Sequence, residues 1–273
     1  MITFSRYDDT EFSLSHSLSP VPDPSRFVLH THAKAELYYF VRGEGIFHIE
    51  GSVYPLKSGD LLLMQSAESH YIELDRSKPY ERIVLHFDLD VLNLVDPQGF
   101  LRKPFLSRNP GKQNRYHANQ FRGGSCEHYF KTMLRCTPDP RISIFAGLIP
   151  LLYELCQLIN TPENIPEDAP DTIGYQIMRY LNQNIDKHLS LDDICRQFYI
   201  SKSQLCRIFR DSAGVTVKQY INVKRLVKAK QLLDAGDAPT RVYLQCGFSD
   251  YSSFYRAYVK YFGTTPSKDT TLK

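Results

Sequence analysis

The sequence predicts an α+β protein of two domains, an N-terminal domain of antiparallel strands and a C-terminal domain made only of helices. Between residues 27 and 90 the apolar residues alternate or form short runs separated by glycine, which is typical of strands. From residue 172 onward they recur at helical spacing. Charge divides the chain at the same place: residues 1–171 carry 17 basic and 22 acidic side chains (net −5), residues 172–273 carry 16 and 8 (net +8), and the two sum to +3. A basic module favours an anionic partner, nucleic acid before membrane.

Composition excludes several classes of protein. With 42% hydrophobic and 12% aromatic residues, the chain is neither disordered nor collagen-like. No apolar run approaches the ~20 residues of a membrane span, and the first residues do not form a secretory signal. The six cysteines form no C-x-x-C pair and indicate reduced thiols. We therefore expect a cytoplasmic protein without a membrane partner.

Six short segments carry the strand pattern of the N-terminal domain. So many short antiparallel strands close together predict a barrel or a sandwich. The proline-containing stretch 96–120 indicates irregular connections or a short helix. The expected strands are Leu37–Val41, Gly45–Ile49, Val53–Leu56, Leu61–Met64, Tyr71–Leu74 and Ile83–Phe87.

A pair of antiparallel helices is expected in residues 121–160. Helical spacing begins at Cys126, is interrupted by two prolines in residues 137–140, and resumes around Phe145. The second helix is apolar on more than one side. Either it packs one face on the strands and another on a second copy of the chain, which would make the hairpin a dimerisation element, or both faces are covered within one chain.

Residues 161–171 form the predicted linker, because they and Asn160 contain three prolines, four acids and no periodicity. The resulting organisation is a strand domain in residues 1–120, a helical hairpin in 121–160, the linker, and an all-helical domain in 172–273.

The all-helical domain contains a helix-turn-helix pattern. Ser190 and Ser201 suit the first position of two successive helices. In the second of these helices Leu205, Ile208 and Phe209 share one face, and polar or cationic residues occupy the other. Such a helix, packed behind and polar in front, fits the major groove of DNA.

The same pattern returns 49 residues later. Leu205, Arg207 and Phe209 correspond to Phe254, Arg256 and Tyr258, and a continuous helical pattern over Val217–Leu233 lies between the copies. One helix therefore joins two helix-turn-helix units. It could place two recognition helices about 34 Å apart, in successive major grooves.

These motifs resemble the AraC/XylS family of bacterial transcription regulators over Leu189–Pro266. The resemblance rests on Ser201-x-x-x-Leu205-x-Arg207-x-Phe209, on Arg225-Leu226-x-x-Ala229, and on Cys246-Gly247-Phe248-Ser249-Asp250 with the residues that follow. It implies a double helix-turn-helix domain that binds double-stranded DNA. The implied contact residues are Lys202, Ser203, Gln204, Cys206, Arg207, Tyr251, Ser252, Ser253, Tyr255 and Arg256.

Two positions depart from that family. Where the first helix of each unit usually has a small residue, this chain has Cys195 and Tyr243. A tyrosine there predicts looser packing or an altered angle in the second unit. Arg207 and Arg256 are the side chains that we expect to contact base edges or phosphates.

A second group of residues indicates a binding pocket in the strand domain. His30-x-His32-x-x-x-Glu36, followed later by His70, resembles the cupin barrel, and alternation on a strand would put the first three side chains on one face. Two interpretations stay open: residues of a ligand pocket bordered by an N-terminal arm (Phe4–Arg26), or a metal site formed by His30, His32, Glu36 and His70. The pocket is the expectation, without metal or cofactor. Its expected lining residues are His30, His32, Glu36, Tyr38, His70 and His86.

Together these features predict a ligand-responsive, sequence-specific transcription regulator. The resemblance implies a small polar effector, with a sugar favoured, a homodimer, and contact with RNA polymerase if the protein is an activator. The alternative is a metal-dependent cupin enzyme with an appended nucleic-acid module. A helical protein-interaction module, the third possibility, does not explain the repeat.

Overall fold

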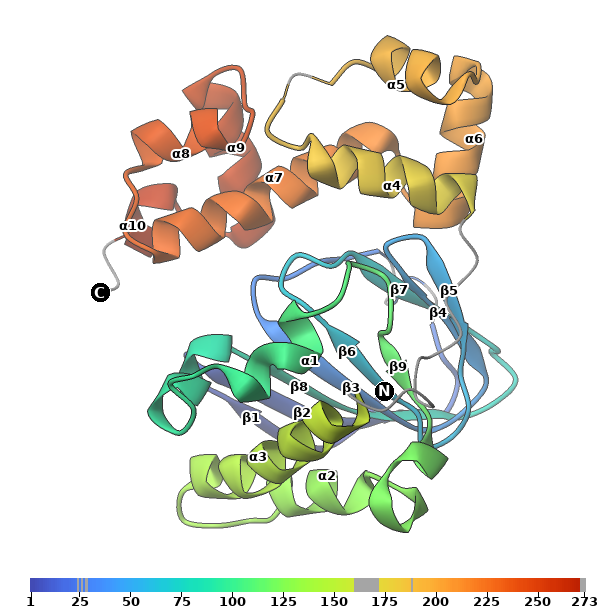
Figure 1. The fold of residues 1–273 in the computed structure, drawn as a ribbon, viewed down its shortest axis with the longest axis vertical. Coiled ribbons are helices and arrows are strands. Elements are labelled where there is room, and N and C mark those ends of the chain that lie inside the picture. Colours follow the sequence, from blue (N-terminus) through green and yellow to red (C-terminus); the bar gives the residue numbers. More distant parts are fainter. Residues whose placement is uncertain (24, 26, 28, 160–171, 188, 271–273) are drawn as a thin grey trace. The chain divides into compact units, whose positions relative to one another are not determined.

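A computed structural model describes residues 1–23, 25, 27, 29–159, 172–187 and 189–270 (Figure 1). The chain divides into two compact units, of which one holds most of residues 1–170, and the other holds the helices that follow residue 171 together with Leu29–Ala33 and Ala67–His70. The predicted linker, residues 161–171, lies outside the described residues. The two units are considered separately below.

The first unit is built on two antiparallel sheets. Six strands pair in the order β1-β2-β8-β3-β6-β9, and three pair in the order β5-β4-β7. All six predicted strands are present, with bounds that differ from the predicted ones by at most three residues at either end. The strands are β1 (Ile2–Asp8), β2 (Phe12–Ser19), β3 (Ala35–Arg42), β4 (Gly45–Ile49), β5 (Ser52–Pro55), β6 (Leu61–Met64), β7 (His70–Leu74), β8 (Tyr80–Phe87) and β9 (Arg115–Tyr116).

The N-terminal segment is not the arm that the sequence suggested. It forms β1 and β2, which pair with each other and extend the large sheet beyond β8. In β2 apolar or aromatic residues alternate with serines at 13, 15, 17 and 19, so one face of the strand is hydrophobic and the other carries hydroxyls. This alternation was the available signal for the strand.

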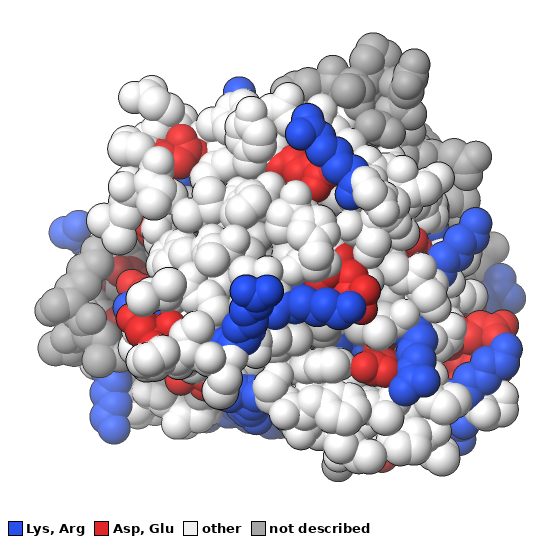
Figure 2. All heavy atoms as spheres, turned by 90° about the horizontal axis from the view of Figure 1, so that it is seen from below, with Lys and Arg blue, Asp and Glu red and all other residues white. Residues whose placement is uncertain are grey.

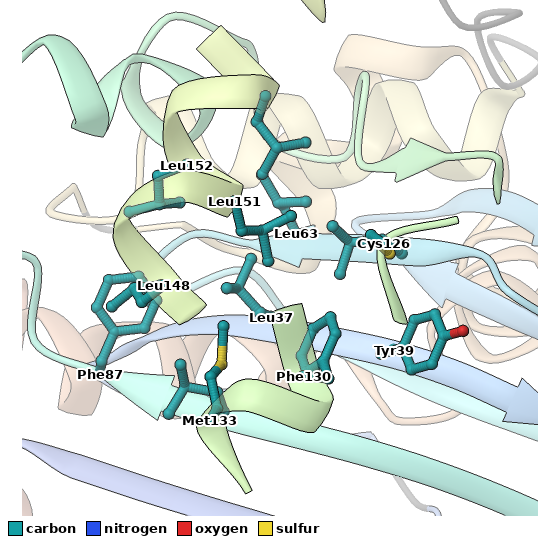
Figure 3. Packing of buried hydrophobic residues seen from close by; sticks show 14 of the residues in the cluster. Leu37, Tyr39, Leu63, Phe87, Cys126, Phe130, Met133, Leu148, Leu151 and Leu152 are labelled. Atoms are coloured by element: carbon teal, nitrogen blue, oxygen red, sulfur yellow. The ribbon is translucent and has the colours of Figure 1, made fainter. Parts of the chain in front are cut away.

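Strand β3 separates two hydrophobic cores. Leu37 and Tyr39 point to the first core, where Tyr39 stacks on Phe130 with ring centroids 4.9 Å apart (Figure 3). Tyr38 and Phe40 point to the second core, between the two sheets. All four side chains are buried. The alternating directions thus give β3 two buried faces.

Two helices cover the first core and confirm the predicted hairpin. They are α2 (Glu127–Met133) and α3 (Pro140–Leu158). Asp139 caps α3 by accepting a hydrogen bond from the Arg141 N–H at 3.0 Å. The helices approach closely at Gly147, where a Cβ atom would lie 2.4 Å from the carbonyl oxygen of Tyr129. Between β8 and α2 lie short elements: η2 (Leu89–Leu94), η3 (Phe100–Arg102), α1 (Lys103–Leu106), η4 (Ala118–Gln120) and η5 (Arg122–Gly124).

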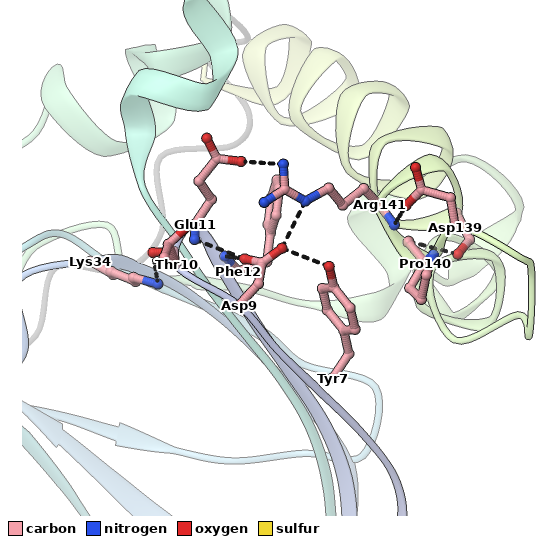
Figure 4. A network of polar contacts seen from close by, with 10 residues as sticks. Tyr7, Asp9, Thr10, Glu11, Phe12, Lys34, Asp139, Pro140 and Arg141 are labelled. Atoms are coloured by element: carbon pink, nitrogen blue, oxygen red, sulfur yellow. Dashed lines mark hydrogen bonds and ion pairs between the residues drawn. The ribbon is translucent and has the colours of Figure 1, made fainter. Parts of the chain in front are cut away.

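A polar network joins the turn between β1 and β2 to the start of α3 (Figure 4). Arg141 donates from Nε to Asp9 at 2.8 Å and pairs through Nη1 with Glu11 at 3.0 Å. The Asp9 carboxylate also accepts hydrogen bonds from the Tyr7 hydroxyl and from the N–H groups of Glu11 and Phe12. The network therefore fixes the β1–β2 turn against the hairpin.

Helix α3 has the length and apolar composition of a membrane span, unlike any other helix in the described part of the chain. In its most apolar window 56% of the helix is buried within the protein. A core helix of a water-soluble domain has the same properties, so this feature gives only weak support for a membrane location.

After residue 171, all regular secondary structure of the described residues is helical. The long helix α7 connects two groups of shorter helices, as the sequence predicted (Figure 1). The helices are α4 (Ile173–Gln183), α5 (Leu191–Phe198), α6 (Lys202–Ala213), α7 (Val217–Asp234), α8 (Pro239–Gln245), α9 (Tyr251–Phe262) and α10 (Pro266–Thr270).

Candidate nucleic-acid interface and effector site

Helices α5 and α6 form the first helix-turn-helix unit, and side-chain caps define both helix starts. The Ser190 hydroxyl accepts from the Asp193 N–H at 3.1 Å, and the Ser201 hydroxyl accepts from the Gln204 N–H at 3.2 Å. Gln204 returns the interaction by accepting from the Ser201 N–H at 2.9 Å. Both are capping boxes, and the two predicted caps are thus confirmed.

The turn between these helices passes through Tyr199. This residue has a left-handed backbone with φ 54°, and its side chain is 96% exposed. A non-glycine residue in that conformation costs roughly 1–2 kcal/mol. The turn therefore keeps an exposed aromatic ring beside the recognition helix at the expense of backbone strain.

Helix α6 has the predicted division into a buried back and an exposed front. Leu205 and Phe209 are fully buried, and Ile208 packs against the same core. The back of α6 also meets α4, where a Cβ on Gly174 would overlap the Ser212 side chain. The predicted contact residues of this helix are all exposed: Lys202, Ser203, Gln204, Cys206 and Arg207.

Helix α9 repeats this arrangement in the second unit. Both recognition helices have 12 residues and begin 49 residues apart, and each ends at a glycine with φ 71°, Gly214 or Gly263. Phe254 and Tyr258 take the buried places of Leu205 and Phe209. Asp250 caps α9 by accepting from the Ser253 N–H at 2.7 Å. The repeat seen in the sequence is therefore also a repeat of caps, core positions and helix ends.

The front of α9 is less exposed than that of α6. Ser252, Tyr255 and Arg256 are exposed, whereas Tyr251 and Ser253 are half-buried. Tyr243 of α8 packs edge-to-face on Tyr251 with ring centroids 5.7 Å apart. The tyrosine that departs from the family pattern thus contacts the first residue of the second recognition helix, and part of the Tyr251 ring belongs to the core.

The cationic side chains on the exposed fronts of α6 and α9 differ in their surroundings. Lys202 pairs with Asp192 at 2.8 Å, and both side chains are more than half exposed. Arg207 and Arg256 are exposed and make no ion pair within the described part of the chain. A solvent-exposed ion pair contributes little to stability, so Lys202 can exchange Asp192 for a phosphate. Arg207 and Arg256 can bind a phosphate without first breaking an ion pair.

Arg225 has a structural place that the sequence did not reveal. From α7 it donates through Nε to the Ile185 carbonyl oxygen at 2.8 Å and through Nη2 to that of Lys187 at 2.7 Å. Its guanidinium carbon lies 6.0 Å from the Phe248 ring centroid. Burial lowers the pKa of Arg225 from its ordinary value. Arg225 therefore joins the loop after α4 to the turn after α8, in the second helix-turn-helix unit.

In the β-rich unit, three candidate effector residues share one face of the large sheet: Glu36 and Tyr38 of β3 and His86 of β8. Glu36 and His86 are cross-strand neighbours, and the His86 Nε2 atom lies 3.3 Å from a Glu36 carboxylate oxygen. The next inward positions, Tyr38 and Val84, lie in the second core. Tyr38 is buried with its hydroxyl against that of Tyr80. Tyr38 is thus a core residue beside the polar pair and not a freely exposed pocket residue.

The three other histidines lie outside the strand on which the sequence placed two of them. His30 and His32 precede β3, which begins at Ala35, and His30 instead forms an isolated bridge with His70 at the start of β7. The ring centroids of His30 and His32 lie 4.3 and 5.1 Å from that of His70. The predicted placement of His30 and His32 on a strand with Glu36 is therefore wrong, although His30, His32 and His70 do lie close together.

A metal site would need imidazoles together with a carboxylate, a donor set that Zn²⁺ and related cations accept. Glu36 and His86 form one such pair. His30, His32 and His70 form a separate cluster of imidazoles.

The chain matches two family descriptions. Residues 22–124 match the AraC-like ligand binding domain, and residues 194–270 match a helix-turn-helix domain. The chain belongs to the AraC family of transcription regulators. The double helix-turn-helix unit of this AraC-type regulator binds DNA, and its β-rich unit is the ligand-binding domain.

Full-length relatives agree with this assignment. The HTH-type transcriptional activator RhaR of Mannheimia succiniciproducens is 24% identical over 246 residues, which cover 89% of this chain and 86% of the relative. The Msm operon regulatory protein of Streptococcus mutans is 23% identical over 239 residues, 85% of this chain and 82% of the relative. Among solved structures, fatty-acid-bound ToxT from Vibrio cholerae is 14% identical, covers 98% of both chains and has a TM-score of 0.39.

Proposed function

We propose that this AraC-type regulator is a cytoplasmic, homodimeric transcription activator that contacts RNA polymerase and responds to a small polar effector, with a sugar as the favoured class. The observation that carries the DNA-binding part is the duplicated recognition helix. α6 and α9 have equal length, equivalent buried positions and exposed arginines at equivalent places, Arg207 and Arg256. The relatives named as activators support the direction of regulation.

Both recognition helices are proposed to enter one face of the duplex. Helix α7 has 18 residues and is therefore about 27 Å long at 1.5 Å per residue. With the helices packed at its two ends, this length suits two major grooves one turn apart. The ten predicted residues supply the contacts, of which Arg207 and Arg256 carry the largest share and Tyr251 a smaller one because of its half-burial.

The dimer is proposed to form through an exposed stripe on α3. Ile142 and Tyr153 are 65% and 55% exposed, and Ala146 and Pro150 lie on the same face at helical spacing. The molecular surface in Figure 2 is largely uncharged, with basic and acidic side chains mixed over it. A large apolar stripe on a helix whose opposite side is already packed favours contact with a second copy.

Footprinting tests the proposed DNA complex. DNA fragments enriched from genomic DNA by the full chain should show, for each protomer, two protected major-groove segments about 10 base pairs apart on one face. The Arg256→Ala variant should lose protection of only one segment, and the Arg207→Ala variant of only the other. Protection of a single segment by the unaltered chain would contradict the two-helix arrangement.

The Glu36–His86 pair and the cluster of His30, His32 and His70 favour a second candidate function, that of a metal-dependent enzyme. These groups could supply ligands to a divalent cation, which would act as a Lewis acid. Metal analysis of protein purified without chelator separates the two functions. A stoichiometric metal that is lost in both the His30→Ala and the Glu36→Ala variants would favour the enzyme, and DNA binding that does not depend on metal would favour the regulator.

A further inference from the structure

Arg82 lies on the inner face of β8, within the proposed effector domain. Its neighbours at alternate positions, Tyr80 and Val84, belong to the core between the two sheets, so the Arg82 side chain leaves the strand on the same side. The guanidinium carbon lies 5.0 Å from the Tyr80 ring centroid and 5.3 Å from that of Phe27. Two aromatic rings thus hold one positive charge in a defined place.

This charge is incompletely satisfied. The Nη1 atom of Arg82 is buried and makes no hydrogen bond within the described residues, and the side chain forms no ion pair there. A guanidinium stays protonated in proteins, so it cannot escape the cost by losing its proton. A buried donor without a partner destabilises the fold, and a charged one does so more strongly. The arrangement is thus suited to an anion that supplies the missing acceptor.

Hydroxyl groups line the adjacent strand on the same face. Strand β2 pairs with β8 so that Ser17 is opposite Arg82, Ser15 opposite Val84 and Ser13 opposite His86. Ser17 is buried, and Ser13 and Ser15 are half-buried. Serine hydroxyls can donate and accept, as the hydroxyls of a sugar require. This face therefore combines one fixed cation with a row of hydroxyls.

We propose that the effector is a sugar acid, whose carboxylate pairs with Arg82 and whose hydroxyls bind Ser15 and Ser17 of β2, since the Ser13 hydroxyl already donates to Asp8. The proposal rests on the proposed ligand-responsive function and names the ligand class of that domain. One guanidinium carries one positive charge and can bind a carboxylate through two parallel hydrogen bonds. A doubly charged phosphate would leave a negative charge uncompensated by Arg82.

Calorimetry on the full chain at constant ionic strength compares acids with their neutral parents. The probes are glucuronate with glucose, galacturonate with galactose, and glucose 6-phosphate. At least one uronate should bind tenfold or more tightly than its parent sugar and more tightly than the sugar phosphate. Equal or tighter binding of the neutral sugar overturns the proposal, and tighter binding of the phosphate overturns the choice of carboxylate.

Two variants separate ligand recognition from a structural role. Arg82→Met removes the charge but keeps much of the side-chain stem, so the uronate preference should disappear while the ligand-free protein unfolds at the same or a higher temperature, because an unpaired buried charge has gone. Arg42→Met is the control on the same sheet, since Arg42 already pairs with Glu81 at 2.7 Å, and it should keep the preference.

A preference that survives Arg82→Met, or a large loss of stability in that variant without ligand, would overturn the assignment. If no sugar of either kind binds, the sugar-acid proposal fails. DNA binding measured on the same preparation then decides separately whether the regulator function stands.

Discussion

Arg225 and Phe248 lie together at the junction of the two helix-turn-helix units, with the guanidinium carbon 6.0 Å from the ring centroid. The same guanidinium donates to the carbonyl oxygens of Ile185 and Lys187. Gly247 is part of this junction, because a Cβ there would lie 2.7 Å from the Asp186 carbonyl oxygen and 3.0 Å from Arg225 Nη2. The Arg225 of the family motif is thus a residue that positions the two units.

Replacing Arg225 with Met should destabilise the helical unit by about 1–3 kcal/mol, since two carbonyl groups lose their charged donor. DNA affinity should fall as well, because the spacing of the recognition helices loses a restraint. Thermal unfolding and DNA titration measure both effects. Lys218→Met on exposed α7 surface is the control for the lost charge, and it should leave stability unchanged. Equal stability of the Arg225→Met variant and the unaltered chain would contradict the junction role.

Asp9 should give the β-rich unit an acid-sensitive contribution to stability. Burial by itself would raise the pKa of this carboxyl, but hydrogen bonds from Tyr7, Phe12, Glu11 and Arg141 outweigh burial and lower the pKa from 3.8 to about 2. A carboxyl with a lowered pKa in the folded state stabilises the fold above its unfolded value, and the stabilisation is lost as the pH falls from about 4 toward 2.

The Asp9→Asn variant tests this linkage. Its unfolding temperature should lie below that of the unaltered chain at pH 6 and should approach it at pH 2.5. Asp75→Asn is the comparison: hydrogen bonds from Ser77 also lower the pKa of the Asp75 carboxyl, but this turn is exposed, so the same trend with pH should be smaller there. A constant difference between Asp9→Asn and the unaltered chain over this pH range would contradict the proposed role of ionised Asp9.

Substitutions at two residues with a left-handed backbone should change the stability of the helical unit in opposite directions. Tyr199→Gly relieves the backbone at φ 54° and should stabilise the helical unit by up to about 1 kcal/mol, since the ring is exposed and contributes little packing. Gly263→Ala introduces the same strain at φ 71° and should destabilise by a similar amount. Chemical denaturation measures both. A loss of stability in Tyr199→Gly would show that the exposed ring makes a contact that stabilises the free protein.

The α3 stripe predicts how the oligomeric state responds to charge. Tyr153→Glu puts a carboxylate into the proposed interface in place of one of its two largest exposed side chains, so sedimentation should show the dimer dissociating at concentrations where the unaltered chain remains dimeric. Glu127→Gln on α2 changes charge at an exposed site outside the stripe and should leave the dimer intact. A chain that is monomeric without any substitution would refute this interface.

Periodicity predicted the elements of this protein better than it predicted its sites. Six strands, the α2–α3 hairpin and the repeated helices were found, because each buries side chains at a regular spacing. β1 and β2 were missed, since serine fills the polar positions of β2 and charged residues occur in β1. His30 and His32 were assigned to a strand that begins only at Ala35.

Contacts between residues that are far apart in the sequence explain the features that periodicity did not predict. The carbonyl partners of Arg225 lie about 40 positions earlier in the chain, and the rings around Arg82 come from a different segment and from its own strand. Neither arrangement leaves a periodic signal. The recognition fronts could be predicted because the repeat places their exposed and buried residues by helical spacing alone.

We propose that the exposed fronts of α6 and α9 bind DNA, and the affinity of Arg207→Ala for a specific promoter fragment at matched salt measures this. Arg76→Ala, which removes the same charge from an exposed turn of the other unit, is the control. We expect at least tenfold weaker binding for Arg207→Ala with unchanged unfolding temperature, unaltered affinity for Arg76→Ala, and a steep fall in affinity as salt rises. Equal affinity of Arg207→Ala and the unaltered chain would contradict it.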